Sequence, residues 1–310
     1  MKPAAFDYIA PRTVPEALDA LADGDRMTQV LAGGQSLLLE MHLERIRPDL
    51  VVDINRIPEL DHLRVIDNTL QVGALIRHQV FESAQAAPGP LGSLFALAVV
   101  NIAHPPIRSR GTMVGSFGWG HPASEWCAIA MALDADIQLQ GRQGARTVAA
   151  RDYFHGPLTT ERRPGELITS VTYPLLTEDT GVGFIEHRRT HFCFAQVAAA
   201  AVLTAHDGVI REARIGLVNC ADRPLRAHAA EQALTGVEIG PPADGYQLPE
   251  SHPFARAGRI AAEQDADPIA EPYAGLEYRR HAIAVVTART LCQAANDHRS
   301  RSGKSQGDGQ

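Results

Sequence analysis

The sequence predicts an α+β protein with two domains. Its 310 residues are enough for about two domains of ordinary size. Strand patterns and helix patterns are interspersed as far as Tyr173, and residues 174–180 then have the composition of a linker. Beyond the linker, two long apolar strands over 197–205 and 209–218 are joined by Asp207-Gly208, which is typical of an antiparallel hairpin.

The N-terminal domain is expected to begin with a helix between two strands. Thr13 precedes Pro15, Glu16 and an apolar helical series, so its side chain can cap that helix. Further on, Asp67-Asn68 joins two strand patterns into a hairpin. We expect strands near 6–9, 29–32, 51–54, 63–66, 70–72, 136–140, 145–148 and 167–173, and helices near 37–41, 76–86, 91–101 and 122–133.

The C-terminal domain is expected to end in an amphipathic helix. Leu276, Ile283, Val286, Thr290 and Ala294 recur at helical spacing. Residues 296–310 contain no large apolar side chain, so we expect a disordered tail there.

The composition is that of a globular protein with an acidic surface. Apolar residues make up 45% of the chain and charged residues 21%, and 36 acidic residues outnumber 29 basic ones for a net charge of −7. Nucleic-acid binding relies on clustered positive charge, which this sequence lacks. Its basic clusters are only the adjacent pairs Arg162-Arg163, Arg188-Arg189 and Arg279-Arg280. We therefore expect no nucleic-acid partner.

The cysteines and the apolar runs indicate the cellular compartment. The cysteines lie far apart without a C-x-x-C pair, which favours neither a zinc site nor an iron–sulfur cluster and is typical of a reducing compartment. The histidines show no metal-ligand spacing. We expect no signal peptide, because the acid Asp7 comes before any apolar run, and the apolar runs further on are shorter than the ~18 residues of a membrane span. We therefore expect a cytoplasmic protein without membrane insertion. The cysteines that this argument concerns are Cys127, Cys193, Cys220 and Cys292.

A run of small residues at 32–36, Ala-Gly-Gly-Gln-Ser, lies between a strand pattern and a short helical pattern. Glycine has no Cβ, so the main chain can approach a ligand closely and its N–H groups can face a phosphate. The following helix adds unpaired N–H groups, and Ser36 adds a hydroxyl. Taken alone, the run is equally an ordinary connecting turn.

A second run of small residues, Gly-Thr-Met-Val-Gly-Ser, occupies 111–116. One such run is a weak signal, but two in the same chain predict a diphosphate bound from both sides by main-chain donors. Neither run fits G-x-G-x-x-G, so a Rossmann nucleotide site is not indicated.

Three segments, in order along the chain, resemble motifs of one family. Residues 32–36 are similar to the A-G-G-[HQ]-S loop of the FAD-binding subunits of molybdenum hydroxylases. Residues 104–112, His-Pro-Pro-Ile-Arg-Ser-Arg-Gly-Thr, resemble their H-P-Q-I-R-N-x-G-T segment, and residues 122–125, Pro-Ala-Ser-Glu, resemble their P-[AG]-[AS]-[DE]. Weaker similarities extend the resemblance from about residue 4 to 295. The general likeness is to the medium chain of aerobic carbon monoxide dehydrogenase and its relatives.

The resemblance implies an FAD-binding domain of the vanillyl-alcohol-oxidase/PCMH type in two subdomains. A C-terminal domain of the CO dehydrogenase flavoprotein type follows, with a small antiparallel sheet and helices. We place the first domain at 1–176, with subdomains of about 1–57 and 58–176, the second at 177–295, and the tail at 296–310.

The resemblance also implies which residues contact FAD. The two glycine-containing runs would bind the diphosphate. Glu125 would accept hydrogen bonds from FAD hydroxyls, although a helix dipole also favours an acid there. Phe194 would lie over the isoalloxazine and other apolar residues would line the cofactor, but core packing accounts for them too. The expected set is Ala32, Gly33, Gly34, Gln35, Ser36, Ile102, Gly111, Thr112, Val114, Gly115, Ser116, Glu125, Leu167, Ile168 and Phe194.

Three positions depart from the family pattern. Val114 replaces the first glycine of the usual Gly-Gly pair, and His121 replaces the usual aspartate before Pro122. Cys193 stands where an acid is common. We expect FAD still to bind, with an affinity or a flavin potential that these residues shift.

The function implied by the resemblance is that of a redox subunit. In the family, a large subunit carries molybdopterin and hydroxylates the substrate, and a small subunit carries two [2Fe-2S] clusters. This chain would then pass electrons from the nearer cluster through FAD to an external acceptor that the sequence does not identify. We expect an oxidoreductase subunit with those two partners and with no catalytic or metal-binding residue of its own.

Two alternatives stay open at this point. The first is a self-sufficient flavin oxidoreductase, which the lack of an evident substrate-binding base or covalent flavin attachment disfavours. The second is a non-redox scaffold that has lost FAD, which Val114 and Cys193 faintly favour.

Overall fold

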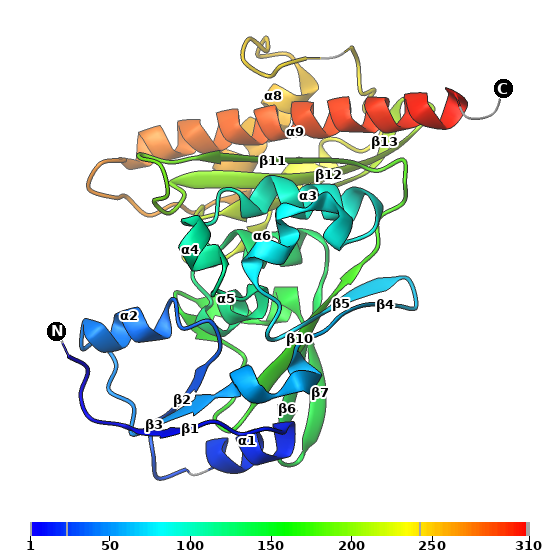
Figure 1. The fold of residues 1–310 in the computed structure, drawn as a ribbon. Coiled ribbons are helices and arrows are strands. Elements are labelled where there is room, and N and C mark those ends of the chain that lie inside the picture. Colours follow the sequence, from blue (N-terminus) through cyan, green and yellow to red (C-terminus); the bar gives the residue numbers. More distant parts are fainter. Residues whose placement is uncertain (1, 23, 242, 308–310) are drawn as a thin grey trace. The chain divides into compact units, whose positions relative to one another are not determined.

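The computed structural model describes residues 2–22, 24–241 and 243–307 (Figure 1). The chain divides into two compact units, each built from three segments. Within the described part of the chain, no helix is long and apolar enough to cross a membrane. Unit 1 comprises Met1–Val80, His104–Trp119 and Ala135–Pro174, and unit 2 comprises Phe81–Ala103, Gly120–Asp134 and Leu175–Gln310.

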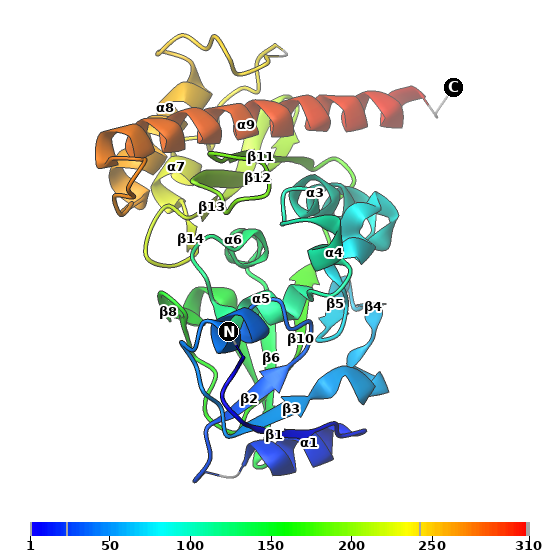
Figure 2. The same cartoon turned by 60° about the vertical axis from the view of Figure 1, so that its left-hand side comes forward.

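Unit 1 begins with a three-stranded parallel sheet in the order β1-β3-β2 (Figure 2). The central strand is the apolar run predicted near 51–54, and its Val51 and Val52 are fully buried. The first helix begins where predicted, because Oγ1 of Thr13 accepts a hydrogen bond from the main-chain N of Glu16. These elements are β1 (Asp7–Ile9), α1 (Val14–Leu21), β2 (Thr28–Leu31), α2 (Leu37–His42) and β3 (Leu50–Asp53).

A five-stranded antiparallel sheet, in the order β4-β5-β10-β6-β7, follows in unit 1. Val171 of β10 lies between Val72 and Ile137 in a buried apolar row. Asp67-Asn68 makes the predicted hairpin turn, and both residues have positive φ. The elements are β4 (Leu63–Ile66), β5 (Thr69–Gly73), α4 (Pro105–Arg108), α5 (Met113–Trp119), β6 (Asp136–Gly141), β7 (Gly144–Ala149), β8 (Phe154–Gly156), β9 (Thr159–Thr160) and β10 (Leu167–Pro174).

Unit 2 is built on a four-stranded antiparallel sheet in the order β11-β12-β13-β14. The hairpin predicted around Asp207-Gly208 is confirmed, with ten residues in each strand. Helix α9 runs across one face of this sheet, and α3 and α6 lie on the other (Figure 1). The elements are α3 (Gly89–Val99), α6 (Glu125–Ala132), β11 (Gly181–His187), β12 (Val197–His206), β13 (Val209–Val218), β14 (Leu225–Arg226), α7 (His228–Gln232), α8 (Pro253–Ile260) and α9 (Leu276–Gly307).

Small residues let the helices of unit 2 approach this sheet closely. A Cβ on Gly181 would lie 2.1 Å from the carbonyl oxygen of Ala294 in α9, and one on Gly183 would lie 2.5 Å from that of Thr290. On the opposite face, a Cβ on Gly216 would lie 2.2 Å from the carbonyl oxygen of Ala128 in α6. The residues of β11 therefore alternate between the α9 face and the α6 face.

The tail expected at 296–310 is wrong as far as residue 307, because α9 continues to Gly307. Residues 308–310 lie outside the described residues. Polar contacts hold this end of the helix in place of the large apolar side chains that it lacks. Oδ2 of Asp297 accepts a hydrogen bond from the main-chain N of Val182, and Nη2 of Arg301 donates to Oγ of Ser93.

The single helix expected over 76–86 is also wrong. The structure has two 3-10 helices there, His78–Glu82 and Ala84–Ala86. Ser83 separates them, because its side chain accepts a hydrogen bond from the main-chain N of Gln85 and so favours a new turn.

Candidate functional site

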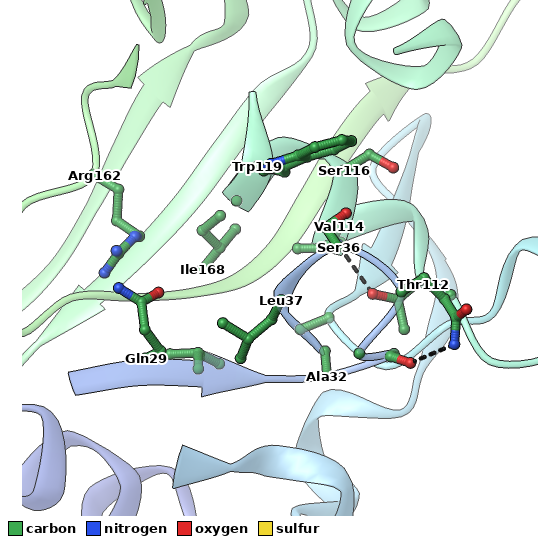
Figure 3. A pocket seen from close by; sticks show the side chains of 18 of the residues that line it. Gln29, Ala32, Ser36, Leu37, Thr112, Val114, Ser116, Trp119, Arg162 and Ile168 are labelled. Carbon is green, nitrogen blue, oxygen red and sulfur yellow. Dashed lines mark hydrogen bonds between the residues drawn. The ribbon is translucent and has the colours of Figure 1, made fainter. Parts of the chain in front are cut away.

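Both glycine-containing runs line one cavity of about 580 Å³ in unit 1 (Figure 3). The first run connects β2 to α2, and the second leads into α5. Residues of β2, β9 and the start of β10 complete the walls. The expected cofactor-binding residues that line this cavity are Ala32, Gly33, Gly34, Gln35, Ser36, Gly111, Thr112, Val114, Gly115, Ser116, Leu167 and Ile168.

The two runs touch each other through their main chains. A Cβ on Gly33 would lie 2.5 Å from the carbonyl oxygen of Arg110 and 2.6 Å from Cα of Gly111, closer than real Cβ contacts. Gly34 has a φ of 75°, which glycine adopts without strain. The local sequence therefore fits a close approach of two backbones, with no side chain between them.

Two polar side chains that the sequence reasoning missed tie the runs together. Nδ2 of Asn55 donates to the carbonyl oxygen of Ala32 at 2.8 Å. Arg77 donates through Nη2 to Oδ1 of Asn55 and through Nη1 to the carbonyl oxygen of Arg110, both at 2.5 Å. One continuous network thus fixes Ala32, the first residue of the first run, and Arg110, the residue before the second. Asn55 and Arg77 belong to no motif, so only the folded arrangement reveals their role.

Asp53 holds Asn55 in this network. Its Oδ1 accepts from Nδ2 of Asn55 at 2.6 Å, and its Oδ2 accepts from the hydroxyl of Tyr8 at 2.5 Å. Burial alone would raise the pKa of Asp53, but the hydrogen bonds from Tyr8 and Asn55 outweigh it and lower that pKa. Asp53 is therefore a carboxylate at neutral pH.

Thr112, within the second run, and His78, beside it, shape this wall of the cavity. Oγ1 of Thr112, a buried residue, accepts a hydrogen bond from the main-chain N of Gly115 at 3.0 Å, which organises the start of α5. Burial, with the charges of Arg108 and Arg77, lowers the pKa of His78 to about 3. His78 is therefore neutral at physiological pH. Val114, one of the departures from the family pattern, is buried in this wall.

The cavity also has an end that carries two polar side chains. Figure 3 shows the amide of Gln29 and the guanidinium of Arg162 pointing toward one another, with Leu37 and Ile168 close by. Nη1 of Arg162 donates to the carbonyl oxygen of Glu166 at 3.0 Å. This end combines apolar surface with polar edges, which suits a flat heterocycle.

Arg146 anchors Glu166 beside that end. Nε and Nη2 of Arg146 donate to the two carboxylate oxygens of Glu166 at 2.7 and 2.9 Å. Burial would raise the pKa of Glu166, but this bidentate pair, with the main-chain N of Arg163, lowers it. The segment that leads into Leu167 is thereby fixed.

The three remaining expected residues belong to unit 2. Ile102 is half-buried, and Glu125 is the buried first residue of α6. Phe194 is 58% exposed, so core packing does not account for it. Its ring stacks on His121, with centroids 4.8 Å apart, and two positions discussed from the sequence are thus neighbours.

The described residues contain no group of three or more His, Cys, Asp or Glu side chains that could hold a metal ion. Cys193 is exposed, with Sγ 2.7 Å from Oγ1 of Thr190. The main-chain cradle and the cavity in unit 1 therefore make up the candidate site.

Comparison with known proteins gives a consistent result. Residues 4–176 match the model of the FAD binding domain in molybdopterin dehydrogenase, and residues 184–294 match that of the CO dehydrogenase flavoprotein C-terminal domain. Caffeine dehydrogenase subunit beta from Pseudomonas sp. (strain CBB1) is 35% identical, over 96% of this chain and 97% of its own. The carbon monoxide dehydrogenase medium chain of Afipia carboxidovorans is 33% identical, and the match covers 95% of this chain and 98% of the relative.

Solved structures agree with these relatives. The Cu,Mo-CO dehydrogenase in its cyanide-inactivated form aligns with a TM-score of 0.87 and 30% identity, over 96% of this chain and all of the matched chain. Quinoline 2-oxidoreductase from Pseudomonas putida 86 aligns with a TM-score of 0.85 and 27% identity, and the match covers 96% of this chain and 99% of the matched chain.

The fold and the site define a flavoprotein component of an oxidoreductase, with FAD as its cofactor. Within that class, the chain belongs to the family of FAD-binding medium subunits of molybdenum hydroxylases that includes the CO dehydrogenase medium chain. The expected family, fold class and cofactor are confirmed. The individual FAD contacts and the domain boundaries stay predictions.

Proposed function

We propose that this chain is the FAD-binding electron-transfer subunit of a heteromeric molybdenum hydroxylase. It receives electrons from a [2Fe-2S] small subunit and delivers them to an external acceptor, while a molybdopterin-binding large subunit hydroxylates the substrate. Family membership supports this role, as do relatives named as subunits of dehydrogenases. When bound, FAD supplies the electron-carrying chemistry, and the protein supplies binding and orientation.

The paired glycine cradle is the observation that carries the proposal. A diphosphate needs main-chain N–H groups that no Cβ covers. Gly33 and Gly111 touch through their backbones, and both line the cavity. The residues present therefore fit the cofactor, and residues 32–36 and 111–116 would hold its diphosphate. Asn55 and Arg77 would keep the two runs in register around it.

The polar end of the cavity would take the adenine half of FAD. The Gln29 amide offers one donor and one acceptor, which match the edge of an adenine ring. The planar guanidinium of Arg162 can stack on such a ring. Contacts of Ile102, Glu125 and Phe194 with the rest of FAD remain part of the proposal and rest on the family resemblance alone.

The test uses the full chain, expressed alone and together with its two partner subunits. We expect the chain to be yellow, to bind one FAD, and to co-purify with both partners. Mixed in a stopped-flow instrument, the reduced [2Fe-2S] subunit should bleach the flavin absorbance. Turnover of a substrate by the isolated chain would favour the self-sufficient oxidoreductase, and a colourless chain with no FAD affinity would favour the scaffold.

A further inference from the structure

A second carboxyl group faces the start of helix α6, where Glu125 lies. Along β11, Gly181 and Gly183 lie against α9, so Glu186 faces the opposite side of the sheet. Helix α6 lies on that side, as the contact between Gly216 and Ala128 shows. The alternation of β11 therefore directs Glu186 toward the helix that Glu125 begins.

The environment of Glu186 offers few partners. Its side chain is 0% exposed, and neither carboxyl oxygen has a hydrogen-bond donor among the described residues. The next residues in its row across the sheet, Ala198 and Val218, are buried and apolar. A charged carboxylate in such a place is strongly disfavoured.

One cation serves both carboxyl groups. Nη1 of Arg188 lies 3.4 Å from Oε1 of Glu186, and the charge of Arg188 also acts on Glu125. Arg188 is fixed on Asn101, to which Nη1 and Nη2 donate at 3.0 Å each. With both carboxyls ionised, this buried group would carry a net negative charge.

Among the residues that the structure describes, the neighbouring elements supply no further counter-charge to the two carboxyls. Helix α3 has no ionisable side chain, and Cys127 on α6 has a pKa that burial raises to about 12. His187, next to Glu186, contacts the hydroxyl of Tyr278. The charged groups of β12, β13 and β14 pair elsewhere or face solvent: Arg211 is exposed, and the pairs are His206 with Asp207, Arg214 with Glu212 and Asp134, and Arg226 with Glu231 and Asp134.

We propose that Glu125 and Glu186 share one proton in the folded chain at neutral pH, and that Glu186 is thereby a positioning residue for the carboxyl of Glu125. The side chains of Glu125 and Glu186 lie within hydrogen-bonding reach of each other. Two carboxylates only accept hydrogen bonds, so a hydrogen bond forms between them when one holds a proton. Arg188 balances the remaining charge. Glu125 is then held in one orientation in which its carboxyl can accept a ligand hydroxyl; this last step rests on the proposed function, whereas the shared proton does not.

The direction of the pKa shifts agrees with this arrangement. Burial raises the pKa of Glu125 to about 7, and burial with the nearby charge of Glu125 raises that of Glu186 to about 8. Because the folded chain keeps a proton that the unfolded chain releases above about pH 4.5, stability falls as pH rises from there to about 8. One such proton changes the folding equilibrium constant by up to about tenfold per pH unit.

The first experiment follows this proton in the chain without FAD. Infrared spectra of the wild type should show a neutral carboxylic acid at pH 7 that disappears above about pH 8. In Glu186→Gln and Glu125→Gln the remaining carboxyl gains an amide donor and loses a neighbouring acid, so its neutral form should disappear at a lower pH than in the wild type. Chemical denaturation of Glu186→Gln should lose most of the dependence on pH between 6 and 8, because the amide donates in place of the shared proton. Glu212→Gln, on the same sheet, is the control. A wild type without the neutral acid at pH 7 overturns the proposal, even where a variant fails to fold.

The second experiment measures FAD affinity from pH 6 to 9. We expect wild-type affinity to fall at least several-fold above pH 8, and that of Glu186→Gln to stay constant. A wild-type affinity that does not change with pH, with the neutral acid present, overturns the positioning role. No FAD binding at any pH contradicts the proposed function, and the infrared result then still decides whether the proton is shared.

Discussion

A Cβ on Gly33 would lie 2.6 Å from Cα of Gly111, so these two residues form a main-chain contact between segments far apart in the sequence. Both residues line the cavity of unit 1. The contact therefore determines how far apart the two sets of main-chain donors lie, and it is the most sensitive point of the cradle.

Substitution of Gly33 by valine should separate the two runs. The new side chain would overlap the main chain at Arg110 and Gly111, which cannot give way as a flexible side chain would. We expect FAD content after purification to fall at least tenfold, with about 1–3 kcal/mol lost from stability. Gly156→Val is the control, since a Cβ there has nothing within 4 Å. Equal FAD content in the two variants would contradict the cradle.

Substitution of Asn55 by alanine tests the network that joins the two runs. The change removes the donor to the carbonyl oxygen of Ala32 and leaves Nη2 of Arg77 without its acceptor. Loss of such bonds costs about 1–3 kcal/mol, so we expect FAD to bind about tenfold more weakly in a fluorescence titration. Gln138→Ala, which removes an exposed hydrogen bond to Thr147, serves as the control. An unchanged FAD affinity in Asn55→Ala would show that the network does not position the cradle.

Local sequence signals predicted much of the fold. The cap at Thr13 and the turn at Asp67-Asn68 act within a few residues, and both are confirmed. The two glycine runs were recognisable as motifs, and the structure brings them together. The prediction that FAD is the cofactor came from the family resemblance and not from hydrophobic periodicity.

The features that sequence reasoning missed depend on tertiary contacts. Asn55 and Arg77 acquire their role only because distant segments meet. Glu186 sits in an apolar strand pattern, and nothing in its neighbours along the chain predicts its burial beside α6. The end of α9 was misjudged for the same reason, since Asp297 contributes a hydrogen bond and not apolar surface.

His78 should stay neutral well below the usual pH of histidine titration. Burial and the neighbouring arginines lower its pKa to about 3, from an ordinary value of 6.5. Below pH 6.5 the His78 ring binds a proton in the unfolded chain but not in the folded chain. The free energy of unfolding therefore decreases as pH falls from 6.5 toward 3. NMR signals of the His78 ring at pH 5 should be those of neutral imidazole. A ring that titrates near 6.5 would contradict this account.

Arg279 and Arg280 form an adjacent basic pair in the sequence, but the fold separates their roles. Arg279 is 2% exposed and donates to the carboxylate of Glu271 and to the carbonyl oxygen of Asn219, whereas Arg280 is exposed. Asn219 in turn donates to the carbonyl oxygen of Ala195, next to Phe194. Arg279→Met removes the buried donor to the carbonyl oxygen of Asn219, and should therefore lower the free energy of unfolding by about 1–3 kcal/mol. Arg280→Met should change it by less than about 0.5 kcal/mol in the same chemical denaturation experiment. Equal losses in the two variants would show that the buried guanidinium does not stabilise this part of unit 2.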